Sequence, residues 1–561
     1  MLWVFRRRLT PYGFAAILVV GWSIGLGDVP LYDWDEVNFA ECAREMRLSG
    51  QYLYAQIGFL PFWEKPPLFF WLQALSMAVW GENAFAARFP NLIVSALTLL
   101  TLYEVGRRWH GHAFGTAWML IYGVSLLPSF YARSGLIDPL FNLLMLWALL
   151  AGMKAEAKKP LINSFLFGGG AALATLTKGP VGLLLPSLAV GTWLIWQRRF
   201  REILRLALAG GIVYTFIIGG WIALLYMSGT ETLLKAFWAY QWRLLSTPDA
   251  GHGGPWYYHL VVLAAGMFPA SGWAWGAYRG KSMPKEAYGL LWLTLWTVLI
   301  FSIVKTKIIH YSSLAYYGIA YLGAWTWYHR RDWVQRWGWG IIGVGGILLG
   351  ILTILAGIVM TQQHRWLHLV RDPFAQAALT KAPISWSGWE GWVGFILMIG
   401  ISMVLILNIG YWGRLLAVIV VLMGWEGGVL AIFAPRVEAY TQAPLRHFCM
   451  QAALEGAVVW SLGFKSYIPY FYGKMQPGFS PGAVGSVESF QNILLAGQAP
   501  FPVFFVSRID RYEHFVEEYG LELIGKEGGF VFLRPSLSKG TERVGYHSSE
   551  SSWNKIKSRA H

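Results

Sequence analysis

Apolar stretches separated by short polar turns recur along most of this chain. Most of them come close to the roughly 17–25 residues that a helix needs to cross the hydrocarbon core of a bilayer. The first stretch lies too close to the others to be a cleaved signal peptide. The pattern predicts about thirteen membrane spans, at residues 11–27, 86–106, 113–131, 136–153, 163–177, 180–196, 206–227, 259–277, 287–304, 311–328, 337–360, 390–409 and 412–433.

Three segments depart from this pattern. Residues 28–85 form a long first loop whose first half is too polar to span a membrane. In residues 435–536, short β-type runs flank a helical pattern at 509–519, which predicts a small α/β domain. Residues 537–561 are polar and rich in serine, which is typical of disordered segments. The predicted fold is therefore an α-helical polytopic membrane domain, residues 1–434, followed by a small α/β domain.

Composition supports the membrane assignment and argues against other classes. Hydrophobic residues make up 56% of the chain and charged residues only 13%, about half the charged share of an average soluble domain. The net charge of +15 would fit nucleic-acid binding, but most Lys and Arg form short clusters between apolar runs, where they set membrane orientation. The two cysteines, Cys42 and Cys449, are too few for a metal cluster and are expected to be free thiols.

The basic clusters also predict orientation. Every second connection between spans is basic, beginning with Arg6, Arg7 and Arg8 before the first span. The positive-inside rule therefore places the N-terminus in the cytoplasm. An odd number of spans then places the first loop and residues 435–536 on the periplasmic side of a bacterial inner membrane.

Several cations lie on the predicted outer side, against this orientation signal. Charges at membrane depth are costly unless they are paired or functional, and these recur about one per loop. Lysine supplies a compact charge and arginine a planar fork for phosphate oxygens. The pattern predicts a site for the phosphate of a lipid-linked substrate, formed by Lys65, Lys178, Arg243 and Lys307.

Two adjacent carboxylates, Asp35 and Glu36, lie on the same predicted side. Glycosyl transfer from a phosphate donor needs this combination, because the leaving phosphate must be neutralised and a carboxylate can take a proton from the acceptor hydroxyl. Two carboxylates in different environments could also divide the roles. Purely structural interpretations remain open for neighbouring charges: Asp33 could cap the helix that starts near Asp35, and Arg133 could simply pair with Asp138.

A series of short motifs on the outer side carries a family resemblance. They are Asp35-Glu36, Ala40-Glu41-Cys42-Ala43-Arg44-Glu45-Met46, Phe62-Trp63-Glu64-Lys65-Pro66-Pro67-Leu68, Ala86-Ala87-Arg88-Phe89-Pro90, Gly106-Arg107-Arg108, Leu176-Thr177-Lys178-Gly179-Pro180 and Lys307 to Tyr311. The Asp-Glu dipeptide alone is weak evidence for a protein family, but together with Glu-Lys-Pro-Pro and Thr-Lys-Gly-Pro it becomes strong evidence. With these motifs the chain resembles the bacterial aminoarabinose transferases, lipid A modifying relatives of protein O-mannosyltransferases with the GT-C fold.

The resemblance implies an inverting transfer from an undecaprenyl-phosphate sugar on the periplasmic face. Asp35 would be the catalytic carboxylate, and Lys65 and Tyr311 would bind the donor phosphate. Asp138 and Lys178 would be further groups of the cavity.

The resemblance also raises the question of a metal. Glu64 and His252 resemble a pair where a divalent cation has been seen in the family. One carboxylate and one imidazole are a thin ligand set. A structural or incidental metal is therefore expected, and no cofactor is required.

One departure from the family leaves the substrates open. Aminoarabinose transferases usually show Asp-Glu-x-Arg-Tyr, whereas here Asn38 and Phe39 take the last two positions. The sugar is therefore open, and the acceptor is a lipid A, a protein or a glycan.

Two other classes compete with the enzyme. A transporter or flippase of lipid-linked sugars should show broken helices in matched halves and charges near mid-membrane, but the only obvious break is Gly168-Gly169-Gly170. A scaffold or receptor has no reason to place two carboxylates beside several phosphate-type cations. A membrane glycosyltransferase is the preferred interpretation.

Overall fold

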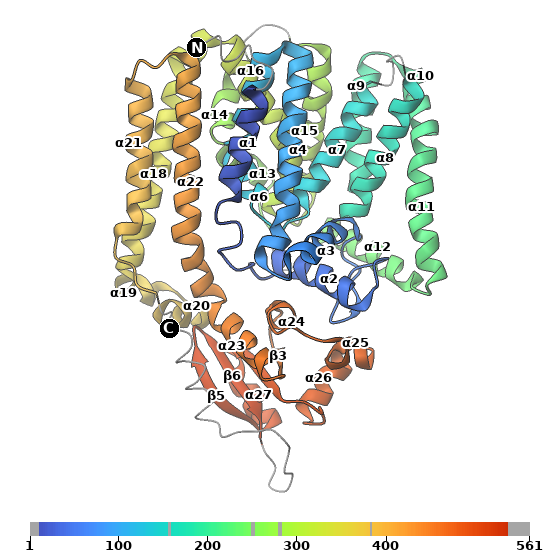
Figure 1. The fold of residues 1–561 in the computed structure, drawn as a ribbon, viewed down its shortest axis with the longest axis vertical. Helices are drawn as coiled ribbons and strands as arrows, with labels where there is room; N and C mark the ends of the chain where they lie inside the picture. Colours follow the sequence, from blue (N-terminus) through green and yellow to red (C-terminus); the bar gives the residue numbers. More distant parts are fainter. Residues whose placement is uncertain (1–9, 155–158, 248–252, 279–282, 382–383, 537–561) are drawn as a thin grey trace.

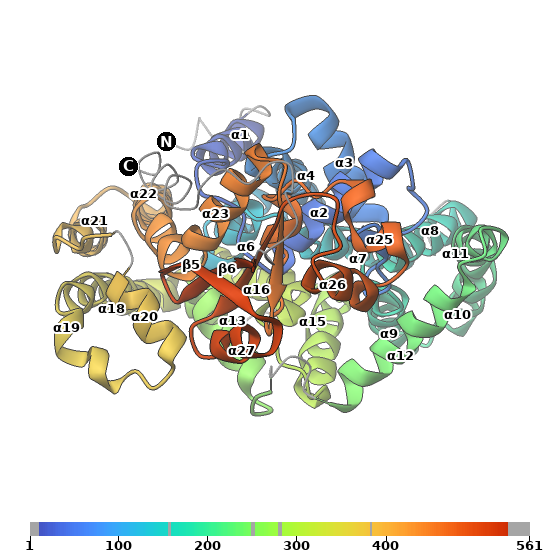
Figure 2. The same ribbon diagram turned by 90° about the horizontal axis from the view of Figure 1, so that it is seen from below.

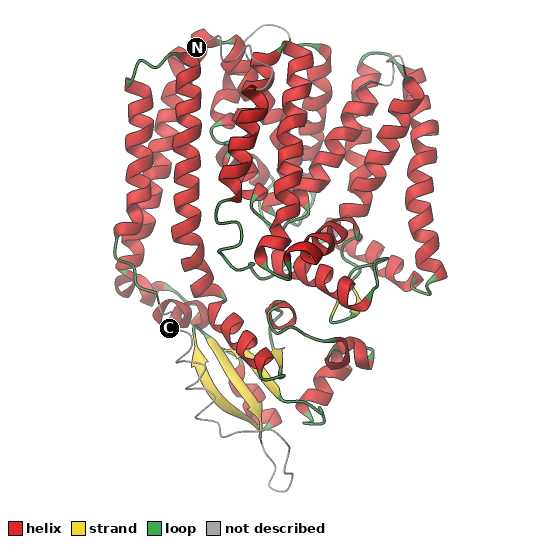
Figure 3. Cartoon of the chain, viewed as in Figure 1, coloured by secondary structure: helices red, strands yellow, loops and turns green. Residues whose placement is uncertain are grey.

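The computed structural model describes residues 10–154, 159–247, 253–278, 283–381 and 384–536. A layer of long helices stands above a smaller unit that contains the longer strands (Figures 1 and 3). The predicted disordered tail, residues 537–561, and the basic cluster Arg6, Arg7 and Arg8 lie outside the described residues.

The helical layer is built from apolar helices joined by short turns. Its elements are α1 (Thr10–Ser23), α4 (Ala84–His110), α5 (His112–Gly123), α6 (Leu126–Ala132), α7 (Asp138–Met153), α8 (Pro160–Lys178), α9 (Val181–Trp196), α10 (Phe200–Arg205), η2 (Leu206–Gly210), α11 (Gly211–Met227), α13 (Tyr258–Gly266), α14 (Ala270–Ala274), η4 (Trp275–Tyr278), α15 (Lys285–Ile303), η5 (Ile309–Ala315), α16 (Tyr316–His329), α17 (Arg331–Trp333), η6 (Val334–Gly338), α18 (Trp339–Thr361), η8 (Trp389–Gly391), α21 (Trp392–Ile406) and α22 (Tyr411–Thr441).

The number of helices that could span a membrane is smaller than predicted when length and hydropathy are the only criteria. Among the described residues seven helices qualify, or nine if two sharply bent pairs each count as one span. Several predicted spans are short in the structure; α9, for example, has 16 residues. The chain is a multi-pass membrane protein, and the count of thirteen stays a prediction.

The first loop and the other connections at the lower edge of this layer form a shelf of shorter elements (Figure 1). They are α2 (Asp35–Ser49), β1 (Gln56–Ile57), β2 (Leu60–Pro61), α3 (Leu68–Trp80), α12 (Glu231–Ser246), α19 (Gln363–Trp366), η7 (Leu367–Leu369) and α20 (Pro373–Lys381).

Although it is polar, α2 is buried along most of its length. Arg44 pairs with Glu41 at 2.6 Å and donates to the carbonyl of Met475 at 2.7 Å. Glu45 accepts backbone N–H groups from Gly58 and Phe59, both at 2.7 Å. Buried charges persist when they are paired and hydrogen-bonded, so this charged motif holds the shelf together.

The C-terminal part contains a four-stranded sheet below the shelf. Its elements are α23 (Ala443–Leu454), β3 (Val458–Leu462), α24 (Ile468–Phe471), η9 (Pro477–Phe479), α25 (Pro481–Val484), α26 (Val487–Leu495), β4 (Val503–Arg508), α27 (Tyr512–Tyr519), β5 (Leu521–Glu527) and β6 (Phe530–Pro535).

Strand order in this sheet is β3-β4-β6-β5, with β3 and β4 parallel and the other pairs antiparallel. Along β6, Val531 and Leu533 contribute to one core cluster while Phe530 and Phe532 contribute to another. Successive side chains of a strand point to opposite faces, so both faces of the sheet are covered. Seen from below, this unit lies across α2 and the middle of the helical layer (Figure 2).

Candidate functional site

A cavity of about 590 Å³ opens between α7, α8, α9, α12, α15 and η5. Its wall is mostly apolar, with residues such as Met145, Val181, Leu184, Trp238 and Ile300. Its charged side chains and two neighbouring rings come from the ends of helices and the connections next to them: Lys65, Asp138, Lys178, His310 and Tyr311; Asn142, Ser187, Gln241 and Ser313 add uncharged polar groups. An apolar groove with a few polar groups suits an amphiphilic ligand.

The chain topology brings these groups together. Asp138 begins α7 and Lys178 ends the neighbouring α8, so an antiparallel pair places the two residues side by side. The Lys178 ammonium lies 2.5 Å from Asp138 Oδ1 and 5.1 Å from the centre of the Tyr311 ring. Asp138 therefore pairs with Lys178 and not with Arg133, which was one interpretation of the sequence.

His310 also faces this group, although no role was predicted for it beyond membership of the motif from Lys307 to Tyr311. Its Nε2 lies 4.0 Å from Asp138 Oδ2. Burial lowers the pKa of His310, and the positive charge of Lys178 acts in the same direction, so both outweigh the opposing effect of Asp138. This environment therefore favours the neutral imidazole.

A second cavity, of about 710 Å³, lies next to the first loop. It is lined by the loop around Asp35, by the turn that carries Arg133 and by α22. Asp35 also lies within electrostatic range of Lys178 and His310 in the first cavity. The two cavities therefore approach each other at Asp35.

Asp35 and Glu36 have opposite environments. Asp35 is half-buried and accepts no hydrogen bond from the described residues. Glu36 accepts four: from Arg88 Nε and Nη2 at 2.9 and 2.8 Å, from the Gly135 N–H at 2.7 Å and from the Tyr32 N–H at 3.1 Å.

These bonds decide the role of Glu36. Burial on its own would raise the pKa of Glu36, but Arg88 and the two backbone donors outweigh it and hold the pKa below its ordinary value. With every lone pair occupied, Glu36 has no free oxygen for a substrate proton. These contacts give Glu36 a structural role in place of the predicted catalytic one, and Asp35 remains the candidate for the reactive carboxylate.

We expect Glu36→Gln to reduce stability rather than chemistry. The change removes charge-assisted hydrogen bonds to a buried arginine, each worth about 1.5–3 kcal/mol. Thermal unfolding of the purified protein should show a lower midpoint, while the folded fraction keeps a kcat close to that of the wild type. A folded variant without activity would return a catalytic role to Glu36.

Two predicted phosphate ligands lie outside the first cavity wall. The Lys307 ammonium donates to the carbonyls of Phe301, Ser302 and Val304 at 2.6–2.8 Å. These carbonyls belong to the last turn of α15, where a cation is favoured. Lys307 therefore stabilises a helix end, and its predicted phosphate contact is corrected.

Arg243 lies on α12, and its guanidinium is 5.2 Å from the centre of the Tyr240 ring. The Lys65 ammonium lies 5.1 Å from the centre of the same ring. Arg243 is therefore close to Lys65 at the margin of the cavity rather than in its wall.

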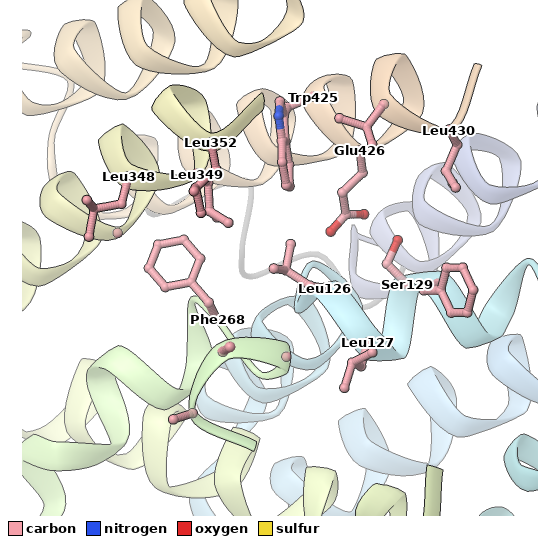
Figure 4. Close-up of a pocket in the computed structure, with 16 residues that line it drawn as sticks. Leu126, Leu127, Ser129, Phe268, Leu348, Leu349, Leu352, Trp425, Glu426 and Leu430 are labelled. Carbon is pink, nitrogen blue, oxygen red and sulfur yellow. The ribbon is translucent and has the colours of Figure 1, made fainter. Parts of the chain in front are cut away.

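A third cavity, of about 480 Å³, lies between α6, α13, α18 and α22 and is almost entirely apolar. Figure 4 shows Glu426 of α22 pointing toward Ser129 of α6 across this space. Glu426 is buried, and Ser129 is the hydrogen-bonding group that faces its carboxylate. Phe130 and Leu430 line this cavity and the second one, so the two cavities are neighbours.

Of the two residues predicted to bind a metal, Glu64 and His252, only Glu64 lies within the described residues. Glu64 Oε1 lies 3.9 Å from the Lys465 ammonium. Within the described ranges no group of three or more metal-binding side chains comes together.

Comparison with known proteins supports the resemblance seen in the motifs. A family model for dolichyl-phosphate-mannose-protein mannosyltransferase matches residues 64–228. An undecaprenyl phosphate-α-4-amino-4-deoxy-L-arabinose arabinosyl transferase of Pseudomonas fluorescens is 26% identical over 63% of this chain and 65% of the relative. Its counterpart in Pseudomonas paraeruginosa is 30% identical over 49% and 51%. The chain thus covers between about half and two thirds of the length of these relatives.

Solved structures extend the likeness to the whole fold. The crystal structure of ArnT from Cupriavidus metallidurans bound to undecaprenyl phosphate has a TM-score of 0.76, with 19% identity, over 95% of this chain and 99% of that one. The apo form gives 0.73, with 21% identity, over 93% and 96%. The predicted resemblance is confirmed: the chain is similar to aminoarabinose transferases and has their GT-C fold.

Proposed function

We propose that this chain is an inverting glycosyltransferase that moves a sugar from a polyprenyl phosphate to a lipid, protein or glycan acceptor. One observation carries the proposal: an apolar cavity containing Lys65, Lys178 and Tyr311 approaches a second cavity at Asp35, a carboxylate that accepts no hydrogen bond from the described residues. The first cavity suits a prenyl chain that ends in a phosphate. The second leaves room for an acceptor on the opposite side of the sugar.

The named relatives support this assignment. Their names specify undecaprenyl phosphate and an arabinosyl group, and the matching structure of ArnT is bound to undecaprenyl phosphate. We extend to this chain the donor class that these names share, a polyprenyl-phosphate sugar.

The proposed reaction is a single displacement. The acceptor oxygen attacks the anomeric carbon while the bond from that carbon to the phosphate oxygen breaks, and polyprenyl phosphate leaves with the electron pair. Lys65 and Lys178 neutralise the phosphate, where stabilising donors matter most as charge develops. Asp35 takes the proton from an acceptor hydroxyl.

We also propose that the site faces the periplasm of a bacterial inner membrane. Asp35 begins α2 on the shelf, on the side of the helical layer where the C-terminal sheet lies (Figure 1). The basic turns that predict a cytoplasmic face belong to the other ends of the helices. In this arrangement the N-terminus is cytoplasmic and residues 435–536 form a periplasmic domain.

The experiment that tests the function is transfer in proteoliposomes from a panel of radiolabelled polyprenyl-phosphate sugars. One member of the panel should lose its label to an acceptor fraction, whether lipid, protein or glycan. Binding or translocation of the donor without transfer would instead assign the chain as a flippase.

Metal removal should leave the reaction unchanged. Lys65 and Lys178 already supply positive charge where the phosphate would bind, so no metal is needed for neutralisation. We expect the rate of transfer after treatment with a chelator to equal the untreated rate. A rate that falls and returns on adding a divalent cation would contradict this proposal and direct attention to Glu64.

A further inference from the structure

The residue before the reactive carboxylate has an unusual backbone. Trp34 has φ 72° and ψ −114°, in the left-handed half of the map that a non-glycine residue rarely adopts. Such a conformation persists only where the surroundings hold it. It lies between Asp33 and Asp35, so whatever holds Trp34 also sets the start of α2.

The side chain of Asp33 stabilises this backbone conformation through hydrogen bonds. Its Oδ1 accepts the N–H of Trp34 at 2.8 Å and the N–H of Tyr467 at 2.9 Å. Ser466 also hydrogen-bonds to this carboxylate. Because α2 has no side-chain cap, the helix-capping interpretation of Asp33 is wrong: its carboxylate joins the first loop to the C-terminal region.

The backbone around Asp33 is joined to the same region. Gln442 accepts the N–H of Asp33 at 2.8 Å and donates to the carbonyl of Leu31 at 2.8 Å. The N–H of Leu31 in turn donates to the Tyr472 hydroxyl at 2.8 Å. Residues 31–33 are thus fixed by groups that follow α22 in the chain.

We propose that Asp33 is a positioning residue through which the C-terminal region holds the strained backbone at Trp34 and so directs the carboxylate of Asp35. Asp35 accepts no hydrogen bond of its own from the described residues, so its orientation depends on this backbone. The inference rests on the proposed role of Asp35. It gives the C-terminal region a part in the chemical step, separate from binding an acceptor.

The N–H groups of Trp34 and Tyr467 need an acceptor oxygen at position 33, but not a negative charge. Burial raises the pKa of Asp33, and the hydrogen bonds from Ser466, Tyr467 and Trp34 offset only part of that effect. This environment therefore disfavours the ionised form. An asparagine keeps Oδ1 for the two backbone donors and can donate its amide to the Ser466 hydroxyl, whereas an alanine keeps neither.

The test compares four full-length variants in proteoliposomes with the donor that the panel identifies: Asp33→Ala, Asp33→Asn, Asp35→Asn and Gln442→Ala. A misplacement of about 1 Å costs on the order of 10²-fold in rate. We expect Asp33→Ala to lower kcat by about 10- to 100-fold and to leave the donor Kd and KM unchanged. Asp33→Asn should restore kcat to near the wild-type value.

Gln442→Ala keeps the inference testable if Asp33→Ala does not fold. Gln442 lies outside the first loop, and the variant loses the two side-chain hydrogen bonds to Asp33 and Leu31. It should show the same pattern, a lower kcat with an unchanged donor Kd. Wild-type kcat in both alanine variants, or equal losses in Asp33→Ala and Asp33→Asn, would overturn the inference. Full activity of Asp35→Asn would instead overturn the proposed function.

Discussion

Replacing Asp35 with asparagine should lower kcat for sugar transfer by about 10²–10⁴-fold, the usual contribution of a positioned general base. The change removes the only group at the junction of the two cavities that is placed to take a proton and is not already hydrogen-bonded within the described residues. It does not alter the apolar cavity, so the affinity for the donor should stay within about twofold. Initial rates and donor binding, measured on the same preparation, check both parts.

Glu36→Gln is the matched control, because it makes the same chemical change at the adjacent residue. It should lower stability and preserve kcat, which is the opposite result. If Asp35→Asn transfers sugar at the wild-type rate, Asp35 is not the base. If both variants lose activity in equal measure, the two carboxylates act together.

Replacing Lys178 with alanine should weaken donor binding by about 10- to 150-fold, which corresponds to the loss of one charge-assisted hydrogen bond of about 1.5–3 kcal/mol. The reason is twofold: a cation is removed, and the buried Asp138, only 3% exposed at its side chain, then repels the phosphate. The donor Kd, measured by titration with a polyprenyl phosphate, checks this result.

A double-mutant cycle separates these two effects. Lys178→Ala with Asp138→Asn removes the repulsion and should recover part of the lost affinity. Lys65 has no carboxylate partner among the described residues, so Lys65→Ala should give a smaller loss that Asp138→Asn does not repair. Equal donor affinity in the wild type and in Lys178→Ala would remove Lys178 from the phosphate site.

The periodicity of apolar residues was sufficient to predict the helical layer, because a helix that crosses a bilayer must satisfy its backbone internally and present apolar side chains. It placed α4 and α18 within four residues of their observed bounds and the start of α22 within one residue, although α22 continues eight residues beyond its predicted end. The short runs at residues 521–524 and 529–533 also predicted strands where β5 and β6 lie. Strand β3 was not among the predicted strands, although it begins with the β-favouring residues Val458, Val459 and Trp460.

For the site, the sequence was a better guide to which residues line the cavity than to which groups each side chain contacts. Lys65, Lys178, Asp138 and Tyr311 do line one cavity, because their motifs lie at helix ends on one side of the layer. Lys307 is also a lysine on the predicted outer side, but its ammonium folds back onto the carbonyls at the end of α15. The spacing of residues in the sequence does not predict this contact.

Tertiary contacts account for the other differences. Glu36 and Asp35 are adjacent carboxylates in the sequence, and only the hydrogen bonds that Glu36 accepts from Arg88 of α4, Gly135 and Tyr32 distinguish them. The link from Asp33 to Tyr467 joins residues 434 positions apart. Close to Asp33 in the chain, this link is reflected in the positive φ of Trp34, which cannot be predicted from the sequence.

The central claim is that a donor held in the Lys65–Lys178 cavity is consumed at Asp35, and single-turnover transfer tests it most directly. Wild-type protein and Asp35→Asn would be loaded with one equivalent of labelled donor in proteoliposomes, then mixed with acceptor. We predict that the wild type releases polyprenyl phosphate and labelled product, while Asp35→Asn retains intact donor. Product formation at the same rate in both would contradict the account.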